Sequence, residues 1–147
     1  MTNNYLKQFD FESWANKLTL KTMQEAAPYD ERTWQLLSHM LNTHSIWLNR
    51  IKNEEPSRGS WDLISPEECA ALIDENTKAW KELIGNTSAE KINELINYRG
   101  KELKFTLDDA IVFLINHSSH HRGQIMLNLK GKVSELPLTT YYAYVMR

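Results

Sequence analysis

The sequence predicts an all-α protein, a four-helix bundle in which residues 1–147 form a single domain. The chain has 147 residues, which is the size of one ordinary domain with a buried core. Apolar side chains recur at helical spacing in four long segments, and most of the 5 glycines and 4 prolines lie between these segments. The sequence shows no internal repeat and no linker long enough to separate two domains.

Composition and charge exclude several classes of protein. Hydrophobic residues make up 41% and charged residues 24%, a typical globular mixture. The net charge of −2 and the scattered Lys and Arg residues give no basic surface for nucleic acid. No stretch approaches the ~20 apolar residues of a membrane-spanning helix, and the polar N-terminus does not resemble a signal peptide. The single cysteine, Cys69, excludes an internal disulfide and fits a reducing compartment, so we expect a cytoplasmic protein.

Two helices are predicted before the longest connection. The first covers residues 4–26, where apolar side chains recur at helical intervals. A turn at residues 27–30 follows, and Asp30 is a suitable N-cap for a second helix at residues 31–52. Residues 53–65 then form a long crossover to the third helix.

The third helix is expected from residue 66 to about residue 84. Ser65 is a suitable N-cap, and it is followed by a proline at the first helical position. A short helical piece is expected at residues 88–95. The turn-forming residues 98–101, flanked by alternating apolar residues, predict a small hairpin before the fourth helix.

The fourth helix is predicted at residues 107–129. Thr106 and Asp109 form a capping arrangement at its start, with Asp in place of the usual Glu. The aromatic tail at residues 136–144 is expected to pack back across the bundle, where its tyrosines could line the mouth of a site. We expect the Cys69 side chain and three tryptophans in the core: Trp34, Trp47 and Trp80.

All five histidines lie on two of these helices, the second and the fourth. His117 and His121 are four residues apart, so they share one face of the fourth helix, which continues into apolar positions. Two imidazoles at this spacing can hold one metal ion, as in the His-x-x-x-His of zinc metalloproteases. Two neutral core histidines, bonded to the backbone or to each other, are the alternative interpretation.

The third ligand of such a site must come from another helix, and spacing alone leaves it open. The apolar stripe of the second helix slightly favours His44, while His39 lies on its flank. A bundle helix has two neighbours, however, so a flank can also face the interior. His120, Arg122 and Gln124 are the candidates for contacts with the metal-binding histidines or with a substrate. For Arg122 an ion pair is an equally good interpretation.

Two segments resemble the DinB-like family of bacterial proteins, which is distinct from the DNA polymerase of the same name. They are residues 37–42 (LSHMLN), leading to Trp47 and Arg50, and the more specific residues 116–125 (NHSSHHRGQI). The resemblance implies a four-helix bundle in which one histidine of the second helix and two of the fourth hold a metal. It assigns the ligands as His39, His117 and His121. His44, which periodicity favours, stays the fallback, and the resemblance implies that it could instead contact the ligands.

Three protein ligands leave a divalent ion with an open position, which is the pattern of catalytic rather than structural zinc. Zinc or nickel is expected first, with manganese and iron as alternatives. Because related bundles are similar to thiol transferases, we expect a metal-dependent transferase of a low-molecular-weight thiol, or a hydrolase. The expected partner is a small-molecule substrate, not nucleic acid or a membrane. The chain could also form a homodimer. The alternative is a non-catalytic metal-binding or stress-related module.

Overall fold

The computed structural model describes residues 2–26 and 30–147, so most of the turn predicted at residues 27–30 lies outside the described residues. The described chain is mostly helical, with one small two-stranded sheet. Its elements, in chain order, are α1 (Thr2–Glu25), α2 (Glu31–Lys52), α3 (Pro66–Gly85), η1 (Lys91–Asn93), β1 (Leu95–Tyr98), β2 (Lys101–Thr106), α4 (Leu107–Leu129) and α5 (Tyr141–Met146).

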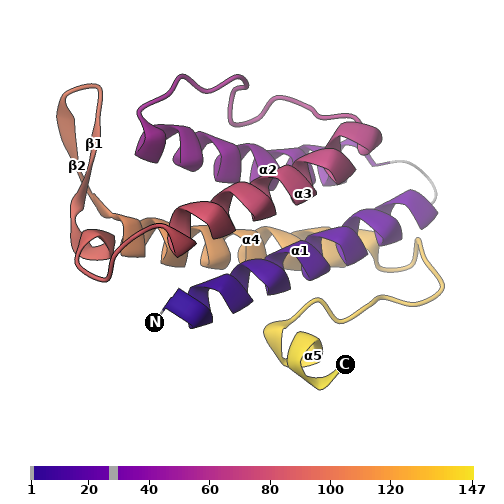
Figure 1. Ribbon diagram of the computed structural model, residues 1–147. Helices are drawn as coiled ribbons and strands as arrows, with labels where there is room; N and C mark the ends of the chain where they lie inside the picture. Colours follow the sequence, from indigo (N-terminus) through magenta and orange to yellow (C-terminus); the bar gives the residue numbers. More distant parts are fainter. Residues whose placement is uncertain (1, 27–29) are drawn as a thin grey trace.

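The four long helices lie alongside one another (Figure 1). α1 packs against α3 and α4, and α2 packs against α4 and α3. The helices that carry the histidines, α2 and α4, are therefore direct neighbours. Among the described helices, none combines the length and the apolar character needed to cross a membrane.

Local capping explains where the helices begin. The Asp30 side chain accepts a hydrogen bond from the Arg32 amide at 3.0 Å, which fixes the start of α2. At the start of α4, the Asp109 amide donates to Thr106 Oγ1 at 3.0 Å, and the Thr106 amide donates to Asp109 Oδ2 at 3.0 Å. This reciprocal pair confirms the predicted capping box. Ser65 forms an equivalent box at the start of α3.

The hairpin before α4 is confirmed, whereas the helical piece predicted at residues 88–95 is wrong beyond one short turn. The 3-10 turn η1 ends at Asn93, because the next residues pair as a strand with β2. Arg99 and Gly100, with φ of 54° and 74°, form the tight connection between the strands. The Arg99 amide donates to Asn53 Oδ1 at 2.8 Å, which ties the hairpin to the end of α2.

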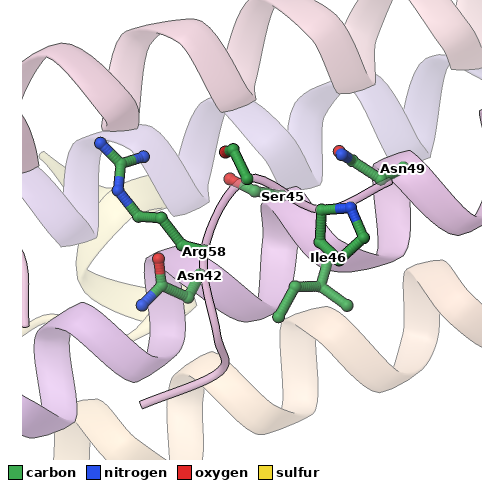
Figure 2. A pocket seen from close by; sticks show the side chains of 7 residues that line it. Asn42, Ser45, Ile46, Asn49 and Arg58 are labelled. Carbon is green, nitrogen blue, oxygen red and sulfur yellow. The ribbon is translucent and has the colours of Figure 1, made fainter. Parts of the chain in front are cut away.

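The crossover between α2 and α3 lies along α2 and is held there by polar side chains of that helix (Figures 1 and 2). Asn42 Nδ2 donates to the Asp62 carbonyl at 2.8 Å, and Asn49 Nδ2 donates to the Glu55 carbonyl at 2.7 Å. The crevice between the crossover and α2 has a volume of about 10 Å³. That is room for about one water molecule, so the crevice is no substrate site.

The apolar core fills the space between the long helices. Trp34 and Trp80 are buried in it, and Cys69 is fully buried, as expected. Trp47 was expected there too, but it is only partly buried. The tail does fold back, and its helix α5 packs on α1 through Tyr144 and Phe11.

Candidate metal centre

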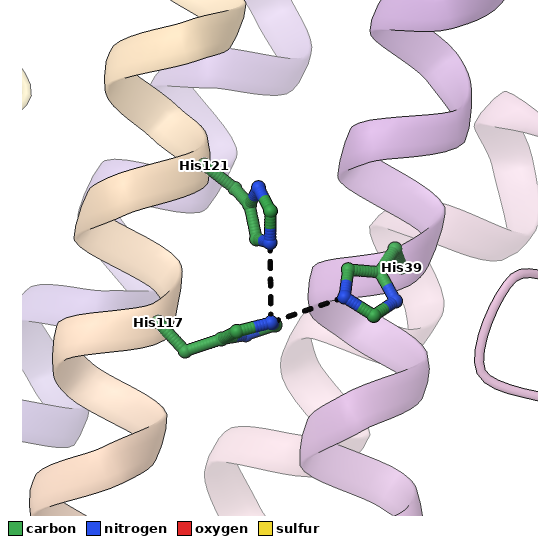
Figure 3. A group of neighbouring side chains, drawn as sticks. All are labelled: His39, His117 and His121. Carbon is green, nitrogen blue, oxygen red and sulfur yellow. Dashed lines mark hydrogen bonds between the residues drawn. The ribbon is translucent and has the colours of Figure 1, made fainter.

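Three histidines from two neighbouring helices meet at one point (Figure 3). His39 comes from α2, and His117 and His121 come from α4. His117 Nε2 lies 3.0 Å from His39 Nε2 and 3.1 Å from His121 Nε2. One ring nitrogen of each residue lies within 4.8 Å of the others, and together these residues can hold a metal ion.

The contacts of the Nδ1 atoms of His39 and His121 indicate how these two rings are protonated. His39 Nδ1 lies 2.9 Å from the Ser60 carbonyl oxygen, and His121 Nδ1 lies 2.7 Å from Gln124 Oε1. Both oxygens are acceptors, so we assign a proton to each Nδ1 and a free lone pair to each Nε2. Metal-binding imidazoles are commonly oriented by such contacts.

The donor set fits a divalent cation. His117 Nε2 faces two lone pairs and carries at most one proton, so without a cation it can donate to only one of its neighbours at a time. A cation between the rings accepts all three lone pairs at once. Nitrogen ligands bound about 2.0–2.1 Å from a tetrahedral zinc ion lie roughly 3.3 Å apart. The observed separations of 3.0 and 3.1 Å are close to that value.

Burial favours the neutral form of His117 and His39, which is the form that binds metal. It is the largest cause that lowers the pKa of His117 from 6.5 to about 4, followed by the proximity of His121 and His39. Burial also lowers the pKa of His39, although the hydrogen bond to Ser60 opposes this shift. At pH 7 both rings are therefore ready to bind without first losing a proton.

A tryptophan of the crossover covers the His39 ring. The Trp61 and His39 rings are stacked, with their centroids 3.8 Å apart and an angle of 4° between their planes. Trp61 is 49% exposed, and the Arg32 guanidinium lies 5.2 Å from its ring centre. Sequence reasoning missed both Trp61 and Ser60, because the crossover has no periodicity that would indicate which helix residue its side chains contact.

His44 lies in the core and not with the three clustered histidines. It is 3% exposed, and its Nε2 lies 2.9 Å from Ser118 Oγ and 3.8 Å from Glu12 Oε2. Burial is the largest cause that lowers the pKa of His44, which favours a neutral ring. The fallback choice for the ligand on α2 thus lies outside the three-histidine group.

The other candidate contacts divide between the core and the site. Arg122 is 1% exposed and forms an ion pair with Glu12 of α1, with nitrogen–oxygen distances of 2.8 and 3.0 Å. The ion-pair interpretation therefore describes Arg122. Gln124 does contact the cluster, through the hydrogen bond with His121. His120 is exposed, and its ring centre lies 5.1 Å from that of His121.

An open cleft of about 290 Å³ lies beside two of the clustered histidines. Trp47 faces this cleft and contacts the rings of Phe105 on β2 and Phe113 on α4, with centroids 5.0 and 5.8 Å away. The tail does not border this space, since Tyr141 lines a different pocket, of about 360 Å³, with residues of α1 and α4. The residues that line the cleft are His39, Thr43, Ile46, Trp47, Arg50, Ser60, Phe113 and His117.

Fold and site together define a class: a mostly helical protein with a three-histidine group that can hold a metal ion. The family model of the DinB superfamily matches residues 5–125, which is more than half of the chain and includes all five histidines. The chain therefore belongs to the DinB superfamily, which confirms the resemblance noted in residues 37–42 and 116–125. The comparisons with curated proteins and with solved structures found no match.

Proposed function

We propose that this protein is a metal-dependent enzyme in which His39, His117 and His121 hold one divalent ion beside a substrate cleft. The observation that carries the proposal is the convergence of three Nε2 atoms next to an open space of about 290 Å³. Three protein ligands leave a coordination position for a substrate, which distinguishes catalytic zinc from closed structural sites. Zinc or nickel is proposed first, with manganese and iron as alternatives.

The proposed reaction attaches a low-molecular-weight thiol to an electrophile: the sulfur forms a bond to the electrophilic carbon, the leaving group departs with its electron pair, and the thiol proton passes to solvent. Hydrolysis is the second reaction class. When bound, the ion would supply Lewis acidity, which favours the thiolate of a coordinating thiol or lowers the pKa of water to about 7. Ser60 and Gln124 orient two of the imidazoles through their Nδ1 atoms. The rings of Trp47 and Phe113 offer an apolar surface to the body of the substrate.

We also propose that the four long helices form the four-helix bundle expected for residues 1–147. The packing of α1 on α3 and of α2 on α4 supports this arrangement. The single, fully buried cysteine supports a reducing compartment such as the cytoplasm. The net charge of −2 favours a small-molecule substrate over nucleic acid. Light scattering tests whether the chain is a monomer or the proposed homodimer.

Metal analysis tests the ligand assignment. The protein should be purified without a metal-affinity column, since nickel from the resin could occupy the site. Reconstitution with zinc, nickel, manganese or iron should give about one ion per chain. His39→Ala, His117→Ala and His121→Ala should each abolish tight binding, whereas His44→Ala and His120→Ala should weaken it modestly or not at all. A stoichiometry near zero with all four metals would refute the proposal.

A cobalt-substituted protein tests the thiol. Adding mercaptoethanol should produce the near-ultraviolet absorption band of a thiolate bound to cobalt, and the His121→Ala protein should not show it. Metal binding without this band would rule out the thiol reaction and leave hydrolysis. Metal binding with neither thiol binding nor hydrolytic turnover would identify a non-catalytic metal-binding module.

A further inference from the structure

We infer that Arg50 forms an anion-binding subsite at the opposite end of the cleft from the histidines and selects substrates that carry a carboxylate there. This inference rests on the proposed function, because it takes the cleft as the substrate site. It adds a specificity-determining residue outside the metal centre.

Four residues of the cleft follow one side of α2. His39, Thr43, Ile46 and Arg50 are spaced three or four residues apart, and all of them line the cleft. The Arg50 guanidinium lies 4.8 Å from the ring centre of Trp47, so its side chain leans back along the helix toward the histidines. His39 and Trp47 are eight residues apart, which places the guanidinium roughly 12 Å along the helix axis from the metal centre.

Arg50 brings positive charge into the cleft without a balancing carboxylate. It is the only formally charged group among the described residues that line the cleft. Within the described chain it forms no ion pair, whereas Arg58, Arg99 and Arg122 each pair with a glutamate. A divalent ion held by neutral imidazoles would add charge of the same sign. The cleft therefore favours an anionic ligand and disfavours a cationic one.

The distance between the three-histidine group and the Arg50 guanidinium sets the length of the ligand. A metal–sulfur bond and a hydrogen bond to the guanidinium would together take up about 5 Å of this distance. A thiol whose sulfur and carboxylate are separated by roughly 7 Å can reach both ends. Its body would lie against Ile46, Trp47 and Phe113, which form the apolar part of the lining.

Arg50 also has structural contacts that need no ligand. A cation in the last turn of α2 interacts favourably with the carbonyl end of the helix, and the guanidinium packs on Trp47. Lys52 offers a matched control, since it is a cation in the same last turn but is exposed and does not line the cleft.

The test compares two thiols that differ only at the end opposite the sulfur: ω-mercaptohexanoate and ω-mercaptohexanol. Calorimetric titration of the zinc-loaded protein should show roughly 10- to 100-fold tighter binding of the carboxylate, as expected for a charged hydrogen bond. Arg50→Gln should remove this preference and leave the affinity for the alcohol unchanged. Lys52→Gln should keep the preference. The zinc content of each variant is measured alongside, so that loss of metal is recognised.

Each alternative result has its own meaning. Equal affinities of the wild-type protein for both thiols would overturn the anion subsite and leave the thiol function intact. A fall in affinity for both thiols in Arg50→Gln would assign Arg50 a structural role and also overturn the inference. If neither thiol binds the zinc-loaded protein, the proposed thiol function fails, and the subsite fails with it.

Discussion

The buried ion pair between Arg122 and Glu12 connects α4 to α1 and gives a quantitative prediction of stability. Arg122→Met keeps most of the side-chain length but removes the guanidinium. The Glu12 carboxylate, 2% exposed, would lose its charged hydrogen bonds at 2.8 and 3.0 Å. The nearby His44 ring lies 3.8 Å away. Burial is the largest cause that lowers the pKa of His44, whereas the charge of Glu12 raises it.

The expected loss follows from leaving this charge buried. Removing one partner of a buried ion pair costs about 3–5 kcal/mol of unfolding free energy. For 147 residues, an unfolding entropy of about 2.1 cal/mol/K per residue converts 4 kcal/mol into a decrease of roughly 13 °C in Tm. Replacing both partners by apolar residues, Glu12→Leu with Arg122→Met, should recover most of this loss, since neither charge is then stranded.

Urea unfolding followed by circular dichroism, with every variant stripped of metal, measures these differences. Lys17→Met is the control, because Lys17 and Asp74 form a 2.6 Å ion pair whose side chains are 53% and 67% exposed. Breaking that pair should cost less than about 1 kcal/mol. The reasoning is refuted if Arg122→Met costs no more than the control, or if the double variant is as unstable as the single one.

Three further predictions concern the Cys69 thiol, the cap at the start of α4, and the hydrogen bond between Gln124 and His121. Burial raises the pKa of Cys69 to about 12, so Ellman's reagent should react with the unfolded protein but not with the native one at pH 8; fast native labelling would contradict this. Hydrogen bonds from Thr106 lower the pKa of Asp109 from its ordinary value of 3.8. The ionised carboxylate therefore stabilises the fold fully at a pH above 3.8, and this stabilisation is lost as the pH falls below that value. Asp109→Ala should therefore destabilise the protein at pH 7 but not at pH 2, and an equal loss at both would be evidence against the cap. Gln124→Leu should reduce zinc affinity about 10- to 100-fold by removing the acceptor for His121 Nδ1, which competition with a chelating dye measures.

Those parts of the fold that depend on local signals could be predicted from the sequence. The starts of α2 and α4 follow from Asp30 and Thr106, whose side chains cap the first turn of each helix. The segment at residues 88–95 was assigned too much helix because the pairing of β1 with β2 is not visible in local spacing. The stacking of Trp61 on His39 could not be predicted for the same reason, because it joins a residue of the crossover to a helix.

The choice between His39 and His44 shows what helical periodicity measures. The apolar stripe of α2 identifies the residues closest to the core, and His44 is indeed almost fully buried. A metal with an open coordination position needs access for its substrate, so its ligands belong at the edge of the stripe. His39 lies there, half-buried beside the cleft. The family resemblance points to His39, which lies in the three-histidine group, whereas periodicity alone favours the more deeply buried His44.

Ser118 and Arg122 of α4 form a polar network in the core with His44 and Glu12. These two residues directly follow the two histidines of α4 that belong to the three-histidine group. His117 and His121 belong to the three-histidine group, while Ser118 and Arg122, about 100° further around the helix, face the core. We therefore expect the ion pair of Arg122 with Glu12 to limit rotation of α4 about its axis and so to hold both histidines opposite His39.

Arg122→Met should consequently weaken zinc binding about 10- to 100-fold, as does loss of other groups that orient ligands. Ile73→Ala provides the matched control, because Ile73 is buried on α3, away from this network, and its truncation should cost about 2–5 kcal/mol. Competition titrations of both variants, at a temperature where both are folded, separate the two effects. If zinc affinity falls equally in both, general loss of stability explains the change, and the ion pair has no specific role in positioning the histidines.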